Sequence, residues 1–167
     1  IGGMGKAAQV HGFQEACSEA VEVAYRDAGI CHVIRAGGLL LLKLIALDDR
    51  PFHRANDVDD ISLFLVRAYS LFLEDIQDHH WDILLEYEID DHYDLQVGGH
   101  YMGRMIRKTA GDNPSLTQRL ATILQGHEAA GPADALQRAL IRQHQLTEEQ
   151  AMICLQAALK GFTPATP

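Results

Sequence analysis

Apolar and polar positions alternate with a period of two near the start of the chain. The runs VEVAYR (21–26) and ICHVIR (30–35) flank a glycine-containing turn, a pattern typical of a β-hairpin. Because successive strand side chains point to opposite faces, three side chains of each run share a face. These are Val21, Val23 and Tyr25 in the first run and Ile30, His32 and Ile34 in the second. A short helix over 13–20 is predicted before the hairpin.

After Gly37-Gly38 the pattern becomes helical. The first helix, about 38–49, is apolar almost all round, which is typical of a helix buried between other elements. It ends at Arg50-Pro51 because proline disfavours helix in the residue before it. Either Asn56 or Asp57 then provides an N-cap for a second helix. The apolar face of that helix consists of Ile61, Phe64, Leu65, Ala68 and Phe72.

Five more helices are predicted further along the chain. The last opens with the capping-box sequence TEEQ from Thr147, and the tail GFTPATP is expected to fray. Gly131-Pro132 marks a break before the last two. The predicted ranges are 74–87, 93–109, 115–127, 133–144 and 147–160. The fold class is therefore α+β and mostly helical, with segments 1–36 (helix and hairpin), 37–128 (helical) and 129–167 (a helical pair and a tail).

Charge is unevenly distributed along the 167 residues, a length that suits one domain. Formal net charge is −9, but 14 acidic and 3 basic residues between Asp48 and Asp94 give that region −11 and leave the rest at +2. This distribution argues against broad binding to a nucleic-acid backbone through the middle of the chain. The acidic stretch Glu74–Asp94 fits a solvated face, with binding of a basic partner as the alternative.

Three cysteines far apart, without a CxxC pair, argue against a disulfide framework and favour a reduced, cytoplasmic setting. The longest apolar run, Leu39–Leu47, is too short to span a bilayer, and Lys43 interrupts it. No signal peptide is visible, so no membrane partner is expected. The opening IGGMGKAA reads like an internal loop, which predicts that the chain is a piece of a longer protein.

Lys43 is the first residue whose chemistry needs an explanation, because it lies within LLLLKLIAL. Helical spacing places Lys43 and Arg50 on one side of the first helix, and Asp57 and Asp60 on one face of the second, whereas Asp59 points elsewhere. A short connection makes the two helices antiparallel neighbours. Two cations and two carboxylates can thus meet at one end of a helical hairpin. The cluster is either a structural ion-pair network or a handle for a phosphate or nucleotide.

Other motifs are weaker. His79, His80 and His92 lie in DHHWD and DDHYD, but adjacent helical residues diverge by about 100° and no HExxH occurs. There is no GxSxG, and Gly2, Gly3 and Gly5 lack the lysine-serine ending of a phosphate-binding loop. The DxD formed by 57–59 opens a helix, where its two carboxylates diverge. These patterns assign no catalytic residue and no metal ligand.

Several segments resemble, in order and spacing, the C-terminal half of a known protein family. They are FQEACSEAVEV, GGLLLLKLIALDDRP, RANDVDDISLFL, IQDHHWDIL and DLQVGGHYMGRMI. The family comprises predicted nucleotidyltransferases related to the AbiEii abortive-infection toxins, within the DNA polymerase β-like superfamily. The resemblance covers roughly residues 1–110. Its most specific part is K-L-x-A-x-x-D-R followed by a helix with D-x-x-D-[IL].

The resemblance implies a nucleotidyltransferase palm, ending in the hairpin, followed by a helical region. It implies metal-dependent transfer of a nucleoside monophosphate from a nucleoside triphosphate (NTP) to a hydroxyl acceptor, with Mg²⁺ and NTP as cofactors. In that superfamily the metal-binding carboxylates lie on strands, and IGG resembles the loop just after the last of them. The metal-binding half is therefore expected to be missing from these residues, and the sequence before Ile1 tests this. Nucleic acid would enter only as an acceptor.

Carried over by position, Lys43 and Arg50 match the family's lysine and arginine, and Asp57 and Asp60 match its two helix aspartates. Lys43 would contact nucleotide phosphates, while the aspartates would orient basic groups around the pocket. This chain has Asn56 where the family usually has lysine, which removes a positive charge. It also has Met105 where an acidic residue is common.

A non-enzymatic helical interaction module is the alternative function. In that case the acidic face binds a protein partner, or the two C-terminal helices form a homo-oligomer. The same C-terminal apolar residues can instead close the chain's own core, which is the favoured interpretation. The residues concerned are Leu136, Leu140, Ile141, Met152, Leu155 and Leu159.

Overall fold

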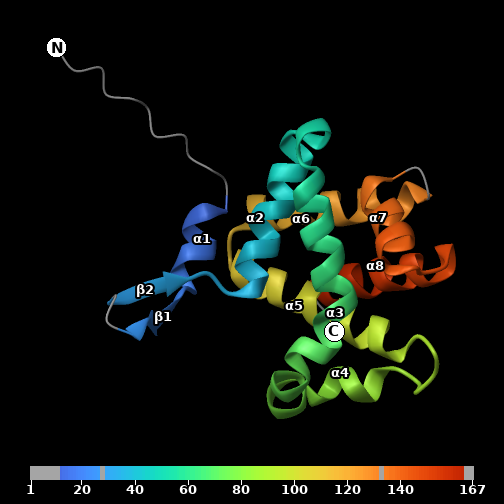
Figure 1. Cartoon of the computed structure of the whole chain (residues 1–167), viewed down its shortest axis with the longest axis horizontal. Helices are drawn as coiled ribbons and strands as arrows, with labels where there is room; N and C mark the ends of the chain where they lie inside the picture. The colour runs from blue at the N-terminus through green and yellow to red at the C-terminus, as the bar shows by residue number, and fades with distance from the viewer. Residues whose placement is uncertain (1–11, 27–28, 132–133, 164–167) are drawn as a thin grey trace.

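The structure, a computed structural model, describes residues 12–26, 29–131 and 134–163. Within these ranges a short helix and a two-stranded hairpin come first, and every later element is helical (Figure 1). The predicted class, α+β and mostly helical, is confirmed. The elements are α1 (Phe13–Ser18), β1 (Val21–Ala24), β2 (Ile30–Val33), α2 (Ala36–Asp49), the 3₁₀ turn η2 (Pro51–His53), α3 (Ala55–His79), α4 (Trp81–Glu86), α5 (Tyr93–Ala110), α6 (Pro114–Ala129), α7 (Ala135–His144) and α8 (Glu148–Phe162).

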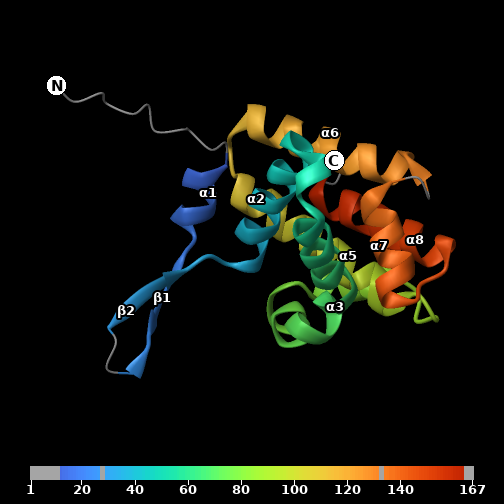
Figure 2. The same cartoon turned by 45° about the horizontal axis from the view of Figure 1, so that its top comes forward.

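The predicted hairpin is present and projects from the helical body (Figure 2). Its strands pair antiparallel, with Val21 opposite Val33 and Ala24 opposite Ile30. Gly29 in the connecting turn has a φ of 98°, which glycine adopts without the steric cost that a side chain would add. Both strands are largely exposed, so the hairpin keeps apolar side chains at its surface.

The core lies between α2, α3, α5 and α8, and α5 runs through its middle (Figures 1 and 2). A single cluster of buried apolar residues extends from α2 to the last turn of α8, so it spans both helical segments expected from the sequence. Helices α5 and α8 approach closely because glycine lines their contact. A Cβ on Gly103 would overlap the backbone oxygen of Ala158.

Helix α2 is buried, as its apolar pattern predicts. Leu40, Leu41 and Leu44 have almost no solvent exposure, because α1, α3, α5 and α6 all pack against this helix. Lys43 is the only basic residue of α2 and lies where α3 begins.

The prediction of one helix over 74–87 is wrong. Helix α3 continues to His79 through a kink at Phe72, where φ and ψ are −122° and 18°, and His80 separates it from α4. Contacts with α5 override the local helical pattern there. The Phe72 ring lies 5.4 Å from the ring of Tyr101, and the Tyr101 hydroxyl donates a hydrogen bond of 2.6 Å to Asp75.

The predicted N-cap of the second helix is also wrong. Arg54 occupies the N-cap position and α3 begins at Ala55, so Asn56 and Asp57 lie in its first turn. The Asp57 carboxylate accepts a hydrogen bond from Lys43 instead of capping its own helix. The Lys43 ammonium carries a full charge, so its hydrogen bond to Asp57 is stronger than one from a neutral backbone amide.

The last helix extends further than predicted, into the first residues of the segment expected to fray. Helix α8 opens at Thr147 with the predicted capping box, but it continues through Gly161 and Phe162. The Phe162 side chain is buried in the core. The segment 164–167 lies outside the described residues, as do Gly2, Gly3, Gly5 and the IGG that contributes to the family resemblance.

Five of the six apolar residues of α7 and α8 singled out above belong to or pack against the chain's own core, as the favoured interpretation predicts, whereas Met152 is partly exposed outside it. Leu136, Leu140 and Leu155 are almost completely buried within this chain and cannot form an external surface. Among the described residues, no helix is both long and apolar enough to cross a membrane.

Candidate functional site

The junction of α2 and α3 brings together three of the four residues singled out by the sequence. Lys43 Nζ lies 2.8 Å from Asp57 Oδ1 and 2.7 Å from Asp60 Oδ2. Because η2 is a single tight turn, α3 folds back along α2 and places its first turn beside Lys43. Asp59 points elsewhere, as predicted, and accepts a hydrogen bond from Gln143 of α7.

Arg50 does not belong to this cluster. It follows the last residue of α2 with an exposed side chain, and its non-helical backbone directs the chain into η2. Arg54 provides the second cation in its place, with its guanidinium 3.5 Å from Asp57 Oδ2. Helical spacing placed Arg50 on the same side as Lys43 because it assumed that the helix includes Arg50, whereas α2 ends at Asp49.

The two carboxylates beside Lys43 differ in exposure. The side chain of Asp57 is 13% exposed and that of Lys43 is 17%, whereas that of Asp60 is 49% exposed. Burial alone would lower the pKa of Lys43, but hydrogen bonds and charge attraction from both aspartates raise it above its usual value. Lys43 therefore remains a cation, and Asp60 is the partner that water and ions can reach.

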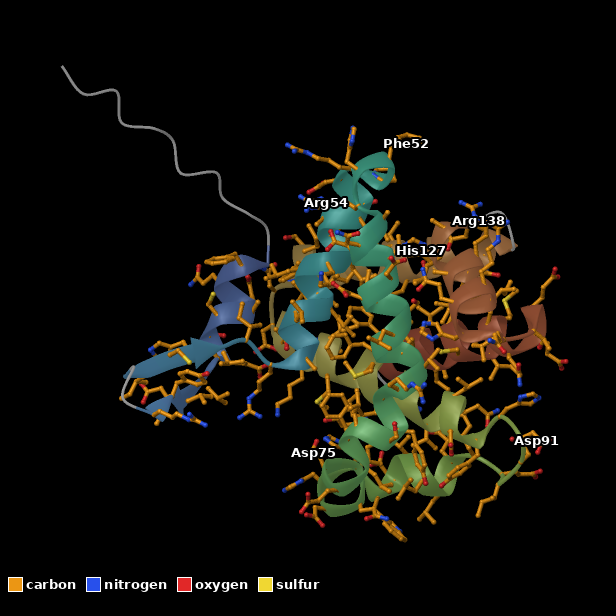
Figure 3. All side chains as sticks on the ribbon, in the orientation of Figure 1. Phe52, Arg54, Asp75, Asp91, His127 and Arg138 are labelled. Carbon is orange, nitrogen blue, oxygen red and sulfur yellow. The ribbon has the colours of Figure 1, made fainter. Side chains whose placement is uncertain are left out.

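The start of α3 contributes further groups that can bind an anion. Its N-cap makes no side-chain hydrogen bond, and the Asp57 amide donates to the backbone oxygen of Arg54 at 3.0 Å, so within the described residues the amides of Ala55 and Asn56 are the ones open to solvent or a ligand. Together with Lys43 and the backbone from Phe52 to Asp57, these amides border an open, mostly polar pocket of about 560 Å³. Figure 3 labels Phe52 and Arg54 at this end of the molecule. The helix dipole favours negative charge here, whereas the charges of Lys43 and Arg54 are balanced by Asp57 and Asp60.

A magnesium ion does not fit the same groups. Its protein ligands are carboxylate and carbonyl oxygens. Asp57 and Asp60 already neutralise Lys43, whose ammonium occupies the space between them. Among the residues that the structure describes, no group of three or more histidine, cysteine, aspartate or glutamate side chains is arranged to hold a metal ion.

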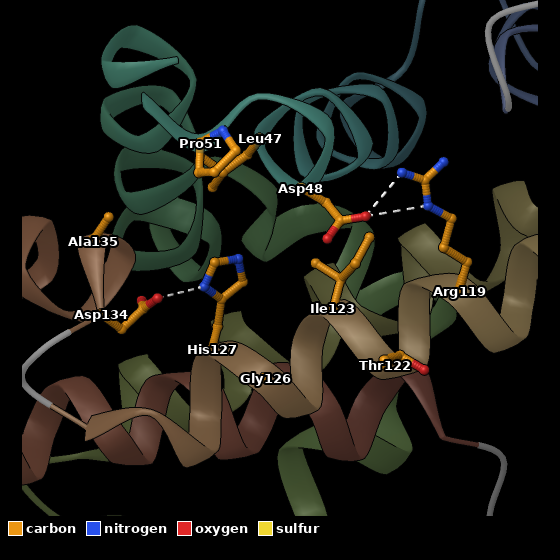
Figure 4. Close-up of a pocket in the computed structure, with 10 residues that line it drawn as sticks. All are labelled: Leu47, Asp48, Pro51, Arg119, Thr122, Ile123, Gly126, His127, Asp134 and Ala135. Atoms are coloured by element: carbon orange, nitrogen blue, oxygen red, sulfur yellow. Dashed lines mark hydrogen bonds and ion pairs between the residues drawn. The ribbon is translucent and has the colours of Figure 1, made fainter. Parts of the chain in front are cut away.

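A second cavity, of about 430 Å³, lies between the end of α2, η2, α6 and the start of α7 (Figure 4). His127 Nδ1 lies 2.8 Å from Asp134 Oδ2, and both side chains are mostly buried. On the opposite side of the cavity, Arg119 binds Asp48 at 2.8 Å and also contacts Asp49. Apolar side chains such as Leu47 form much of the remaining wall.

A third cavity, of about 700 Å³, lies near the kink in α3. One of its lining residues, Asp75, is labelled in Figure 3 at the end of the molecule opposite Phe52. Asp75 lines this cavity and accepts a hydrogen bond from the Tyr101 hydroxyl, which lowers the pKa of Asp75. His79 and His80 also face Asp75, at 3.2 Å and 3.9 Å. Burial and the charge of Arg104 lower the pKa of His80, so neutral pH leaves it uncharged.

No family model matches the chain, and neither the curated proteins nor the solved structures contain a match. The resemblance to nucleotidyltransferases therefore stays a prediction, and the site is interpreted here from its geometry.

Sequence patterns missed two features of these sites. Arg54 precedes the first turn of α3 and lies outside both predicted helices, so helical spacing could not link it to the cluster. His127 lies on α6 and Asp134 is the N-cap residue of α7, with the break at Gly131-Pro132 between them, so no periodicity links them. Their only local signal is that Asp134 follows the break and precedes an apolar helix, which is typical of an N-cap.

Proposed function

We propose that this chain is the nucleotide-contacting helical part of a nucleotidyltransferase-like protein, and that Lys43 binds nucleotide phosphates. The supporting observation is the convergence of Lys43, Asp57 and Asp60 beside the uncapped start of α3. Residues matched to the family motif thereby meet at one pocket, although they lie on two helices.

In this proposal the two aspartates have different roles. Asp57 is nearly buried and also contacts Arg54, so it fixes Lys43 in place. Asp60 is half exposed, and a phosphate oxygen replaces it as the second anion beside Lys43. The exchange conserves charge balance around Lys43, while Arg54 and the first-turn amides of α3 meet the remaining phosphate oxygens.

The hairpin supports the same proposal. Val23, Ile30 and Val33 are exposed on strands that pair only with each other within the described residues. Apolar side chains at the surface of a two-stranded sheet are expected where further strands extend it. This is what a strand pair from a nucleotidyltransferase palm would show outside its full sheet.

The proposal does not place the transfer of the nucleoside monophosphate itself on these 167 residues. In the superfamily that the sequence resembles, bound Mg²⁺ supplies charge stabilisation for the transferred phosphoryl group. Asp57 and Asp60 do not fit as its ligands, because Lys43 already lies between them. Within this chain the proposed role is to bind and orient the triphosphate.

Calorimetric titration of the chain with ATP, GTP, CTP and UTP, each with Mg²⁺, tests the proposal. We expect saturable binding of at least one nucleotide, with affinity about tenfold or more weaker in Lys43→Ala, since a charge-assisted contact is lost. Lys160→Ala is the matched control, because Lys160 is a lysine paired with Glu86 away from this pocket.

Circular dichroism first establishes that Lys43→Ala is folded, and Lys43→Gln provides a second neutral variant of closer length. Absence of nucleotide binding by the unaltered chain would contradict the proposal. Equal binding by the unaltered chain and a folded Lys43 variant would contradict the role of Lys43.

A further inference from the structure

The cavity beside His127 contains a histidine whose orientation is fixed by a capping residue. Asp134 caps α7, and its Oδ1 accepts hydrogen bonds from the backbone of Leu136 and Gln137 at 2.8 and 3.0 Å. Its other oxygen, Oδ2, lies 2.8 Å from His127 Nδ1. Both oxygens of Asp134 are thus engaged, and its carboxylate holds a proton of the imidazole on Nδ1.

This arrangement leaves His127 Nε2 as a free hydrogen-bond acceptor. Nε2 has no hydrogen-bond partner within the part of the chain that the structure describes. Figure 4 shows the ring on the cavity side of α6, with this nitrogen directed across the space toward the end of α2. The imidazole is largely shielded from solvent, with 15% of its side chain exposed.

The other polar groups around the cavity already have partners. Arg119 is bound to Asp48 and Asp49, so it is not available as a strong anion site. The Thr122 hydroxyl donates to the backbone oxygen of Gln118 at 3.0 Å, which removes it as a nucleophile for His127 to activate. The cavity therefore presents one fixed acceptor against largely apolar walls. This is typical of a site that binds a ligand and not of one that carries out covalent catalysis.

We propose that this cavity binds a small molecule with an apolar body and a hydroxyl group, and that the hydroxyl donates a hydrogen bond to His127 Nε2. The apolar body would pack on Leu47, Pro51 and Ile123. A volume of about 430 Å³ lies within the usual range of roughly 300–1,000 Å³ for small-molecule sites. The proposal does not depend on nucleotide binding at Lys43.

The charges of the cavity distinguish a hydroxyl from other head groups. A carboxylate or phosphate would approach Asp48 and Asp134, whose combined charge exceeds that of the single Arg119. An ammonium group gains from that charge but can only donate, whereas a hydroxyl can both donate to and accept from the ring nitrogen His127 Nε2. A neutral hydroxyl satisfies it without placing a new charge in a partly buried site.

Four probes that share one ring test the head group. Nuclear magnetic resonance of imidazole nitrogens in the chain follows His127 during titration with benzyl alcohol, toluene, benzylamine and benzoate. We expect saturable shifts of His127 Nε2 with benzyl alcohol, and about three- to tenfold weaker binding of toluene, the value of one hydrogen bond. Benzoate and benzylamine are expected to bind more weakly than benzyl alcohol.

Two variants separate ligand binding from a purely structural role. His127→Phe keeps an apolar ring but removes the acceptor, so the preference for benzyl alcohol over toluene should disappear. Thr122→Val is the matched control at the cavity wall and should retain that preference, because its hydroxyl serves its own helix.

Several outcomes would overturn the proposal. They are no saturable shift of His127 with benzyl alcohol, equal binding of toluene, or tighter binding of benzoate or benzylamine. If His127→Phe does not fold, the comparison of the four probes on the unaltered chain still decides between these results.

Discussion

Lys43 Nζ donates a hydrogen bond of 2.8 Å to Asp57 Oδ1, and this contact joins the middle of α2 to the first turn of α3. Both side chains are more than four-fifths buried. A lysine within a run of leucines is thereby explained by its partner on the next helix. Because the pair lies next to an open pocket, the same contact can hold the fold together and present a cation to a ligand.

The Lys43–Asp57 contact should contribute more to stability than the Lys43–Asp60 contact. A double-mutant cycle with Lys43→Met, Asp57→Asn and Asp60→Asn measures both coupling energies by urea unfolding. We expect about 1–3 kcal/mol for the nearly buried Asp57 and less than about 1 kcal/mol for the half-exposed Asp60. Equal coupling for both aspartates would contradict this assignment of roles.

The two aspartates should affect nucleotide affinity in opposite directions. Asp60→Asn removes the anion that competes with phosphate for Lys43, so nucleotide binding should strengthen. We expect an increase in affinity of about three- to tenfold, the effect of removing one half-exposed charge. Asp57→Asn loosens Lys43 and Arg54, so binding should weaken. Calorimetric titration with the best-binding nucleotide measures both effects. Weaker binding in both variants would mean that phosphate does not replace Asp60.

Asp134 should stabilise the fold most at neutral pH. Burial alone would raise its pKa, but His127 and the amides of α7 lower it below the usual value of 3.8. A lowered carboxylate pKa contributes stability above the pKa of the unfolded chain, and this contribution is lost as pH falls through the folded pKa. At pH 7, Asp134→Ala should cost about 1–2 kcal/mol, the usual value of an N-cap.

Thermal unfolding between pH 2 and pH 7 measures this effect. The difference between Asp134→Ala and the unaltered chain should shrink below about pH 4, where the carboxylate becomes protonated in the unfolded chain. Asp134→Asn is the control, because asparagine caps a helix equally well but lacks the charge that faces His127. A difference that stays constant across this range would contradict the assignment.

Two glycine substitutions should have opposite effects on stability. Gly103→Ala places a Cβ against the backbone of Ala158, where α5 and α8 touch, and should destabilise the chain by about 3 kcal/mol. Gly126→Ala meets open space within α6 and should stabilise it by about 0.5–1 kcal/mol. Urea unfolding of both variants checks the close helix contact. Similar stabilities for the two variants would contradict it.

Local patterns predicted most of the elements, because hairpin alternation, apolar periodicity and the Thr147 capping box all depend on nearby residues. They failed where distant contacts decide the structure. The kink at Phe72 follows from packing on Tyr101, which lies in a helix nearly thirty residues later. The burial of Phe162 likewise depends on the core that α5 and α8 form together.

In the candidate site, too, local patterns predicted some residues correctly and failed where the path of the chain decides the contact. Helical spacing placed Lys43, Asp57 and Asp60 together because each helix is regular around those residues. It placed Arg50 wrongly because η2 redirects the chain, and the replacement of Arg50 by Arg54 depends on that turn. A turn of three residues has no periodicity from which its direction could be predicted.

The central claim is that the pocket between α2 and α3 binds nucleotide phosphates. Amide chemical shifts of the isotopically labelled chain, titrated with ATP and Mg²⁺, test it most directly. The account predicts saturable shifts concentrated in residues 52–57 and at Lys43, with the same region silent in Lys43→Ala. No saturable shift, or shifts confined to other parts of the chain, would contradict it.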